Sequence, residues 1–185
     1  MEINHLIIIL IIILILFGFM IYDLQSKKQI NNNTNSNKHI YIPQGLNEDH
    51  DAHVLLLTCI DFRTLNDTHN YMKYLGYNDD YDHFILAGAS LGVNQTEYPQ
   101  WKSTFWRHLQ LSDQLHNIQK IIVIDHSDCG AYKLFYPDAN ITLENEFPYH
   151  VDNILKLKKA VNILHPQIAY EGYFLHYNGV MQRIV

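Results

Sequence analysis

Two short motifs, Cys59-Ile-Asp-Phe-Arg63 and His126-Ser-Asp-Cys129, contain both cysteines of the chain. Thiolate sulfur and imidazole nitrogen are ligands that zinc prefers, and three of them leave the fourth tetrahedral position open for a water molecule. The spacing of His126 and Cys129 lets both side chains turn toward one ion, and Cys59 would supply the third ligand from a neighbouring strand. The two motifs therefore predict a zinc site for hydration or hydrolysis.

Asp61 and Arg63 lie beside the first predicted ligand, Cys59. In an extended segment these three side chains point to one side, where Arg63 could hold Asp61 in a bidentate pair. The pair would keep Asp61 off the metal and let it accept a hydrogen bond from a zinc-bound hydroxide. If Arg63 let go, Asp61 could occupy the fourth position and close the site. The alternative is a surface ion pair of little energetic value.

Two simpler interpretations of the cysteine and histidine motifs stay open. In the first, Cys59 and Cys129 are small buried apolar side chains and His126 is a hydrogen-bonded core residue. In the second, the two cysteines form one disulfide. Both would leave the chain without a metal site.

The elements that must position these motifs alternate between strand and helix patterns. Short apolar runs over 53–58, 84–87 and 121–124 predict buried strands. Helical spacing of apolar residues marks 101–115 and 151–164, and the run 173–177 enters a tight hairpin turn at Asn178-Gly179. The order predicts an α/β domain with a mainly parallel sheet flanked by helices. Ligands of such folds collect at the carboxyl ends of the strands, where Cys59 and His126 fall.

The N-terminal part of the chain has a different character. Residues 6–22 form an apolar run without any charge. The length of this run is at the lower limit for a membrane-spanning helix. A retained anchor is favoured over a cleaved signal peptide, because Glu2 precedes the run without any lysine or arginine and no cleavage site follows. Lys27 and Lys28 place the following domain on the cytoplasmic side.

Three segments result from this pattern: a transmembrane anchor over 6–22, an asparagine-rich flexible linker over 23–50 and a zinc domain over 51–185. The linker composition cannot bury enough apolar surface to offset the entropy of ordering it. The last segment is long enough for one domain with one core. The net charge is −6 and no basic patch stands out, so nucleic acid is not expected as a partner.

The pattern Cys-x-Asp-x-Arg followed by His-x-x-Cys-Gly-Ala resembles the β-class carbonic anhydrases. The resemblance implies zinc bound by Cys59, His126 and Cys129, with Asp61 and Arg63 gating and orienting the zinc hydroxide. It implies reversible hydration of carbon dioxide to bicarbonate. It also implies homodimers in which the subunits complete each other's active sites.

Four positions depart from the family pattern. Phe62 stands where the family usually has a small residue, and Asp125 stands where glycine usually precedes the metal histidine. Leu86 begins a segment that usually reads Asn-Ala-Gly, and Asp128 adds a carboxylate between two predicted ligands. These changes indicate a divergent branch with an altered pocket. A catalytically silent zinc module displayed on a membrane and a zinc hydrolase of carbonyl sulfide or carbon disulfide remain alternatives.

A further alternative comes from Gly88-Ala-Ser90-Leu-Gly92, which matches the G-x-S-x-G nucleophile elbow of serine hydrolases. A serine hydrolase would use Ser90 with an acid and a histidine that follow it in the chain; the candidates are Asp138 or Glu144 with His150, His165 or His176. The domain is short for that fold, and glycine-rich strand ends are also common for structural reasons.

Overall fold

The computed structural model of the chain describes residues 17, 18, 20–22 and 50–185. The chain divides into two compact units, Met1–Asn47 and Glu48–Val185. Most of the predicted anchor, and all of the predicted linker except His50, lie outside the described residues. Within the described part, no helix has both the length and the apolar character that crossing a membrane requires. The second unit contains every predicted site residue.

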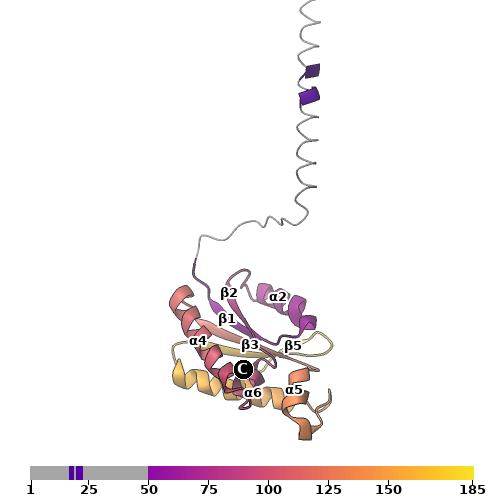
Figure 1. Cartoon of the computed structure of the whole chain (residues 1–185), viewed down its shortest axis with the longest axis vertical. Coiled ribbons are helices and arrows are strands. Elements are labelled where there is room, and N and C mark those ends of the chain that lie inside the picture. The colour runs from indigo at the N-terminus through magenta and orange to yellow at the C-terminus, as the bar shows by residue number, and fades with distance from the viewer. Residues whose placement is uncertain (1–16, 19, 23–49) are drawn as a thin grey trace, which may run out of the picture. The chain divides into compact units, whose positions relative to one another are not determined.

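Strands and helices alternate through the second unit (Figure 1). In chain order they are β1 (Val54–Thr58), η1 (Phe62–Thr64), α2 (Leu65–Tyr74), β2 (Tyr81–Ile85), α3 (Ser90–Asn94), α4 (Pro99–His116), β3 (Lys120–His126), α5 (Gly130–Phe135), η2 (Pro137–Ala139), α6 (Phe147–Leu164), β4 (Ala169–Leu175) and β5 (Met181–Arg183).

The strands form one sheet in the order β2-β1-β3-β4-β5. The first four strands of that order pair in parallel, and β5 pairs antiparallel with β4 through the hairpin at Asn178-Gly179. The predicted α/β fold with a mainly parallel sheet is confirmed. Its register pairs Thr58 with Ile124, so Cys59, the residue after Thr58, reaches the same edge of the sheet as His126.

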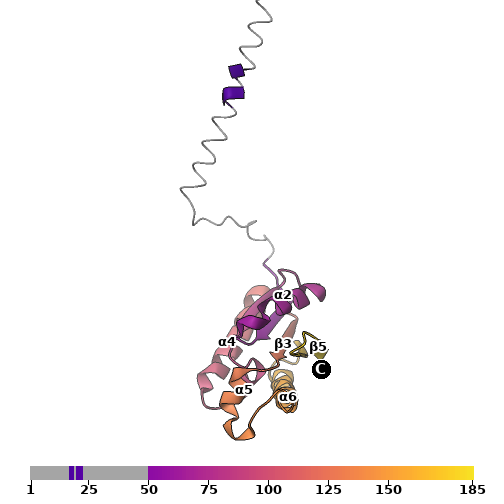
Figure 2. The ribbon, with the colours of Figure 1, turned by 90° about the vertical axis from the view of Figure 1, so that its right-hand side faces the viewer.

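Helices cover both faces of the sheet (Figure 2). Alternate residues of β1 enter different cores, as the two-residue period of a strand requires. Leu55 and Leu57 pack with residues of α4 and α6, whereas Val54 and Leu56 pack with Met72 of α2. Because both faces are buried, the central strands are apolar throughout, which is why their sequences lack polar alternation.

Two elements differ from the prediction for physical reasons. The second strand begins earlier than the predicted 84–87, because β2 is an edge strand with no fully buried residue and its polar start, Tyr81-Asp-His, gives no apolar signal. Helix α2 was not predicted, because its sequence is mainly polar and only Thr68 and Met72 are buried. A single large apolar side chain is too little to establish a helical period.

Candidate metal centre

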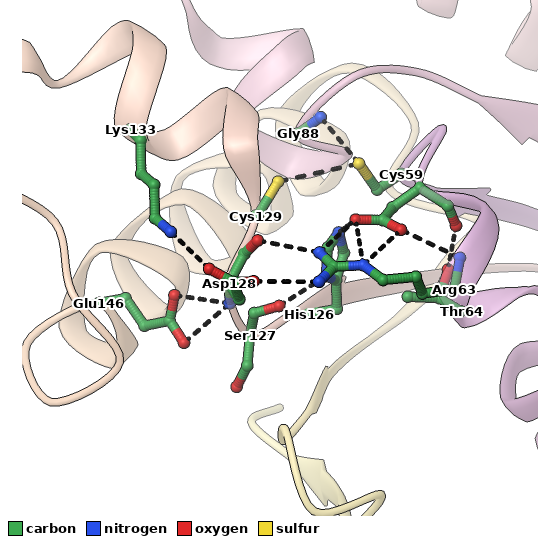
Figure 3. Close-up of polar contacts among 11 residues, drawn as sticks. Cys59, Arg63, Thr64, Gly88, His126, Ser127, Asp128, Cys129, Lys133 and Glu146 are labelled. Atoms are coloured by element: carbon green, nitrogen blue, oxygen red, sulfur yellow. Dashed lines mark hydrogen bonds and ion pairs between the residues drawn. The ribbon is translucent and has the colours of Figure 1, made fainter.

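The two cysteines and His126 meet at the carboxyl edge of the sheet (Figure 3). One potential ligand atom from each residue lies within 4.8 Å of the others, and all three residues are buried. The Sγ atoms of Cys59 and Cys129 are 3.8 Å apart and both thiols are free. That separation is too long for a disulfide bond. Among the described residues, this is the one such group of three or more potential ligands.

Local backbone structure brings the three side chains together. Cys59 directly follows β1, and His126 is the last residue of β3. The chain then turns through Asp128, whose φ of 58° lies in the left-handed region, and Cys129 caps the start of α5. The H-x-x-C spacing thus spans one tight strand-to-helix turn, as the sequence predicted.

The donor atoms fit a zinc ion. Zinc–sulfur bonds of about 2.3 Å at a tetrahedral angle place two sulfur atoms about 3.8 Å apart, which is the separation of Cys59 and Cys129 Sγ. The Nδ1 atom of His126 donates to the carbonyl oxygen of Ser127 at 2.8 Å. That bond leaves the Nε2 lone pair available for a metal, and Nε2 is buried without a hydrogen-bond partner. The simpler interpretation, a hydrogen-bonded core histidine, accounts for Nδ1 but leaves the buried Nε2 atom without a partner.

The two thiols and the imidazole of the cluster shift one another's pKa values. Hydrogen bonding from Cys129 lowers the pKa of the Cys59 thiol, whereas the same contact raises the pKa of Cys129. The contact therefore favours ionisation of Cys59 over ionisation of Cys129. Burial lowers the pKa of His126, but the combined effect of Cys59, the Ser127 carbonyl group and Asp61 outweighs burial and raises it. The backbone N–H of Gly88 also donates to Cys59 Sγ, at 3.4 Å.

Asp61 and Arg63 form the predicted bidentate pair. Arg63 Nη2 donates to Asp61 Oδ2 at 2.6 Å, and Nε donates to Oδ1 at 2.9 Å. The sequence predicts that Asp61 and Arg63 meet because they lie in an extended segment, which is not the case. Instead, the 3-10 helix η1 begins at Phe62 and turns Arg63 back toward Asp61, which is the N-cap residue of η1. Hydrogen bonding from Arg63 lowers the pKa of Asp61 to about 2. Asp61 Oδ2 also lies 3.9 Å from His126 Nε2, so the carboxylate borders the metal position.

A mainly apolar pocket of about 400 Å³ opens on the Cys59 and Asp61 side of the metal centre. Its lining includes Cys59 and Asp61 together with the aromatic side chains of Tyr98, Trp101 and Phe135. The aromatic rings of α4 and α5 contact one another; Trp101 and Phe135, for example, are edge to face with centroids 6.0 Å apart. A small apolar molecule in this pocket would lie next to the metal position.

Asp125 belongs to a buried polar cluster that the sequence did not reveal. The residue is 1% exposed, and its Oδ2 atom accepts hydrogen bonds from Ser90 Oγ at 2.7 Å, Tyr132 Oη at 2.6 Å and His150 Nδ1 at 3.0 Å. The Ser90 N–H donates to Oδ1 at 3.1 Å. Burial raises the pKa of Tyr132, so its hydroxyl stays protonated and donates. The cluster joins β3 to α3, α5 and α6 beneath the metal centre.

The serine-hydrolase interpretation receives no support from this geometry. A nucleophile elbow exposes its serine on a strained turn, but Ser90 is fully buried and donates to Asp125. The strained residue is Ala89, with φ of 44°. The two glycines of the G-x-S-x-G match are required by packing. A Cβ on Gly88 would lie 3.1 Å from Ala131 Cβ, and one on Gly92 would lie 2.4 Å from the carbonyl oxygen of Ala87.

The comparisons with known proteins agree with the site. The family described as "Putative carbonic anhydrase" matches residues 49–185. An uncharacterized protein of Rickettsia bellii is 35% identical over 135 residues, covering 72% of this chain and 82% of that protein. An uncharacterized protein of Rickettsia conorii is 30% identical over 174 residues, covering 91% and 94%.

The fold is also that of a solved β-carbonic anhydrase. The crystal structure of isoform I from Trichomonas vaginalis superposes with a TM-score of 0.50 at 17% identity, covering 88% of this chain and 97% of that one. The family match extends over most of the chain and includes every residue of the metal centre. The chain is therefore a divergent member of the β-carbonic anhydrase family.

Proposed function

We propose that the chain binds one zinc ion through Cys59, His126 and Cys129 and catalyses the reversible hydration of carbon dioxide to bicarbonate. The observation that carries the proposal is the buried ligand cluster, with its 3.8 Å sulfur–sulfur separation and its unpartnered imidazole nitrogen. A buried polar atom without a partner is costly, and a metal ion would remove that cost. Membership of the family supports the reaction.

Zinc in this position would supply a Lewis acid that brings the pKa of a water molecule toward neutrality. The protein's own groups would orient the reactants. Asp61 borders the metal position and is ionised at neutral pH through its pair with Arg63, so it can accept a hydrogen bond from the attacking water. The apolar pocket would hold carbon dioxide beside it. The water oxygen bonds to carbon, bicarbonate leaves, and one proton passes to the buffer.

Metal analysis of the full chain tests the ligand set. We expect one zinc per chain in the wild type and loss of most of it in Cys59→Ala and His126→Ala, because each removes one of three ligands. His69→Ala is the matched control, since His69 is exposed and outside the cluster. A wild type that stays below one equivalent after zinc supplementation contradicts the site.

Stopped-flow measurement of carbon dioxide hydration tests the reaction. We expect zinc-dependent hydration in the wild type and a rate lower by about 10- to 100-fold in Asp61→Asn, because the oriented acceptor is lost. Zinc-loaded protein that does not hydrate carbon dioxide between neutral and alkaline pH would favour the silent zinc module. Turnover of carbonyl sulfide or carbon disulfide by that same protein would favour the alternative hydrolase.

We also propose that the protein forms a homodimer over the mouth of the pocket. Ile60, Phe62 and Leu134 are 65%, 80% and 70% exposed, and Ile60 and Leu134 line the pocket itself. Apolar side chains gathered at a pocket mouth are typical of an interaction surface. Phe62→Glu should shift the mass measured by light scattering from dimer to monomer, whereas Tyr74→Glu, at an equally exposed position on α2, should not. A wild type that is monomeric at high concentration contradicts the proposal.

The apolar run 6–22 supports a further proposal, that the chain is anchored in a membrane with the domain on the cytoplasmic side. Protease treatment of sealed, right-side-out vesicles tests the orientation. The domain should be protected until the vesicles are opened, and recovery of the full chain in the soluble fraction contradicts the anchor.

A further inference from the structure

Arg63 lies between two carboxylates, and the sequence motif accounts for only one of them. Asp61 accepts from Nε and Nη2, the side of the guanidinium group that faces it. Asp128 accepts from the remaining edge: Nη1 donates to Asp128 Oδ2 at 3.0 Å, and Nη2 donates to the Asp128 carbonyl oxygen at 3.1 Å (Figure 3). Every nitrogen of the guanidinium group therefore has an acceptor. The two aspartates bond different nitrogens of Arg63, Nε for Asp61 and Nη1 for Asp128, and they share only Nη2.

Asp128 is itself held in place from two sides. Its backbone N–H donates to both carboxylate oxygens of Glu146, at 3.0 and 2.8 Å, and Glu146 is 1% exposed. Its Oδ1 atom accepts from Lys133 Nζ on α5. A residue in the left-handed region with these contacts has little freedom to move. Asp128 is therefore a fixed point to which the longer, half-exposed side chain of Arg63 is tied.

We propose that Asp128 is a positioning residue that holds Arg63, and through it Asp61, in the arrangement that leaves the metal accessible to an incoming molecule. The inference rests on the proposed function. Asp61 is the carboxylate that borders the metal position, with Oδ2 3.9 Å from His126 Nε2, and its pair with Arg63 engages both of its oxygens. Because the contacts with Asp128 hold the guanidinium group where it pairs with Asp61, they favour the open arrangement.

Cobalt substitution gives a readout that does not depend on turnover. Cobalt bound by two thiolates shows a sulfur-to-cobalt charge-transfer band, and its visible d–d bands change when an anion such as thiocyanate binds the ion. Thiocyanate titration of the cobalt-loaded full chain therefore measures how accessible the metal is. Asp128→Gly removes the side chain, and glycine adopts the left-handed backbone without strain. Asp128→Asn keeps an acceptor and also tolerates that backbone.

We expect the apparent thiocyanate affinity to fall about tenfold in Asp128→Gly, because a charge-assisted contact that favours the open arrangement is lost. Asp128→Asn should restore part of the affinity. Asp79→Gly is the matched control, since Asp79 is an exposed aspartate with φ of 53° in another loop, and it should bind thiocyanate as the wild type does. Asp61→Ala combined with Asp128→Gly should regain wild-type affinity, because no carboxylate remains to close the site.

Unchanged thiocyanate affinity and cobalt spectrum in Asp128→Gly would overturn the inference, as would a double variant that stays impaired. If Asp128→Gly does not fold, Lys133→Gln loosens Asp128 from the surface of α5 and should lower the affinity about threefold; no change there would also overturn it. Failure of the proposed metal site looks different: the wild type would then lack the charge-transfer band when cobalt is added, and the inference would fail with it. A wild type that shows the band but does not hydrate carbon dioxide contradicts the proposed reaction alone.

Discussion

Replacing Asp125 tests whether the buried polar cluster stabilises the fold beneath the metal centre. Asp125→Ala would remove the acceptor of the Ser90 N–H, of His150 Nδ1 and of the hydroxyls of Ser90 and Tyr132. Because those two hydroxyls lie 3.3 Å apart, one can still donate to the other, which leaves three donors without an acceptor. Each buried group left unsatisfied costs about 1–3 kcal/mol. Because the contacts share one carboxylate, the losses are not additive. We expect the free energy of unfolding to fall by about 4 kcal/mol.

Urea unfolding of the full chain, followed through Trp101 and Trp106 on α4, measures this change. With a denaturant slope of about 2 kcal/mol per molar urea, the midpoint should fall by about 2 M while the slope stays the same. Asp152→Ala is the matched control, because Asp152 is exposed on α6. Its change should stay within about 0.5 kcal/mol.

A second variant distinguishes the hydrogen-bond explanation from simple loss of packing. His150 Nε2 already has no partner, so removing Asp125 leaves both ring nitrogens of that fully buried residue unsatisfied. Adding His150→Leu to Asp125→Ala should therefore recover about 1–2 kcal/mol, because an apolar side chain removes both groups. The reasoning is refuted if the effects of the two substitutions add within about 0.5 kcal/mol.

Three smaller effects are expected at other positions. Gly92→Ala should lower the free energy of unfolding by about 2 kcal/mol in the same urea assay, because its Cβ would lie 2.4 Å from the carbonyl oxygen of Ala87; a neutral change contradicts it. Burial lowers the pKa of His83, so an NMR titration should give a value below about 6.5. As the pH falls, the unfolded chain takes up a proton at His83 before the folded chain does. The stability due to neutral His83 is therefore fully present above the unfolded-state pKa of about 6.5 and is lost as the pH falls through the folded-state pKa. A fluorophosphonate probe should not label Ser90, which is fully buried; labelling would revive the serine-hydrolase alternative.

The parts of the fold that the sequence predicted are those with strong local signals. The apolar runs of β1 and β3 and the spaced apolar residues of α4 and α6 identify buried elements directly. The site followed from a rule of topology, because parallel strands bring their carboxyl ends to one edge. Only residue type and strand position were needed to bring Cys59 and His126 together.

The parts that sequence did not predict depend on contacts between distant residues. Asp125 reads as an unexplained charge within an apolar strand, and its partners Ser90 and His150 are 35 and 25 positions away. No local spacing relates them. The tie between Arg63 and Asp128 spans 65 positions and depends on a left-handed backbone that aspartate adopts only occasionally. Helix α2 lacked an apolar period altogether.

The two aspartates on either side of His126 bear on whether the site is active or silent. From sequence alone, Asp125 and Asp128 look like losses from the family pattern. In the structure each carboxylate has several specific partners: Asp125 ties together the helices beneath the centre, and Asp128 ties Arg63 above it. Both carboxylates are thus accommodated without disturbing the ligand cluster or the Asp61–Arg63 pair. The two departures from the family pattern therefore give no support of their own to the silent module, and the hydration assay decides between the two proposals.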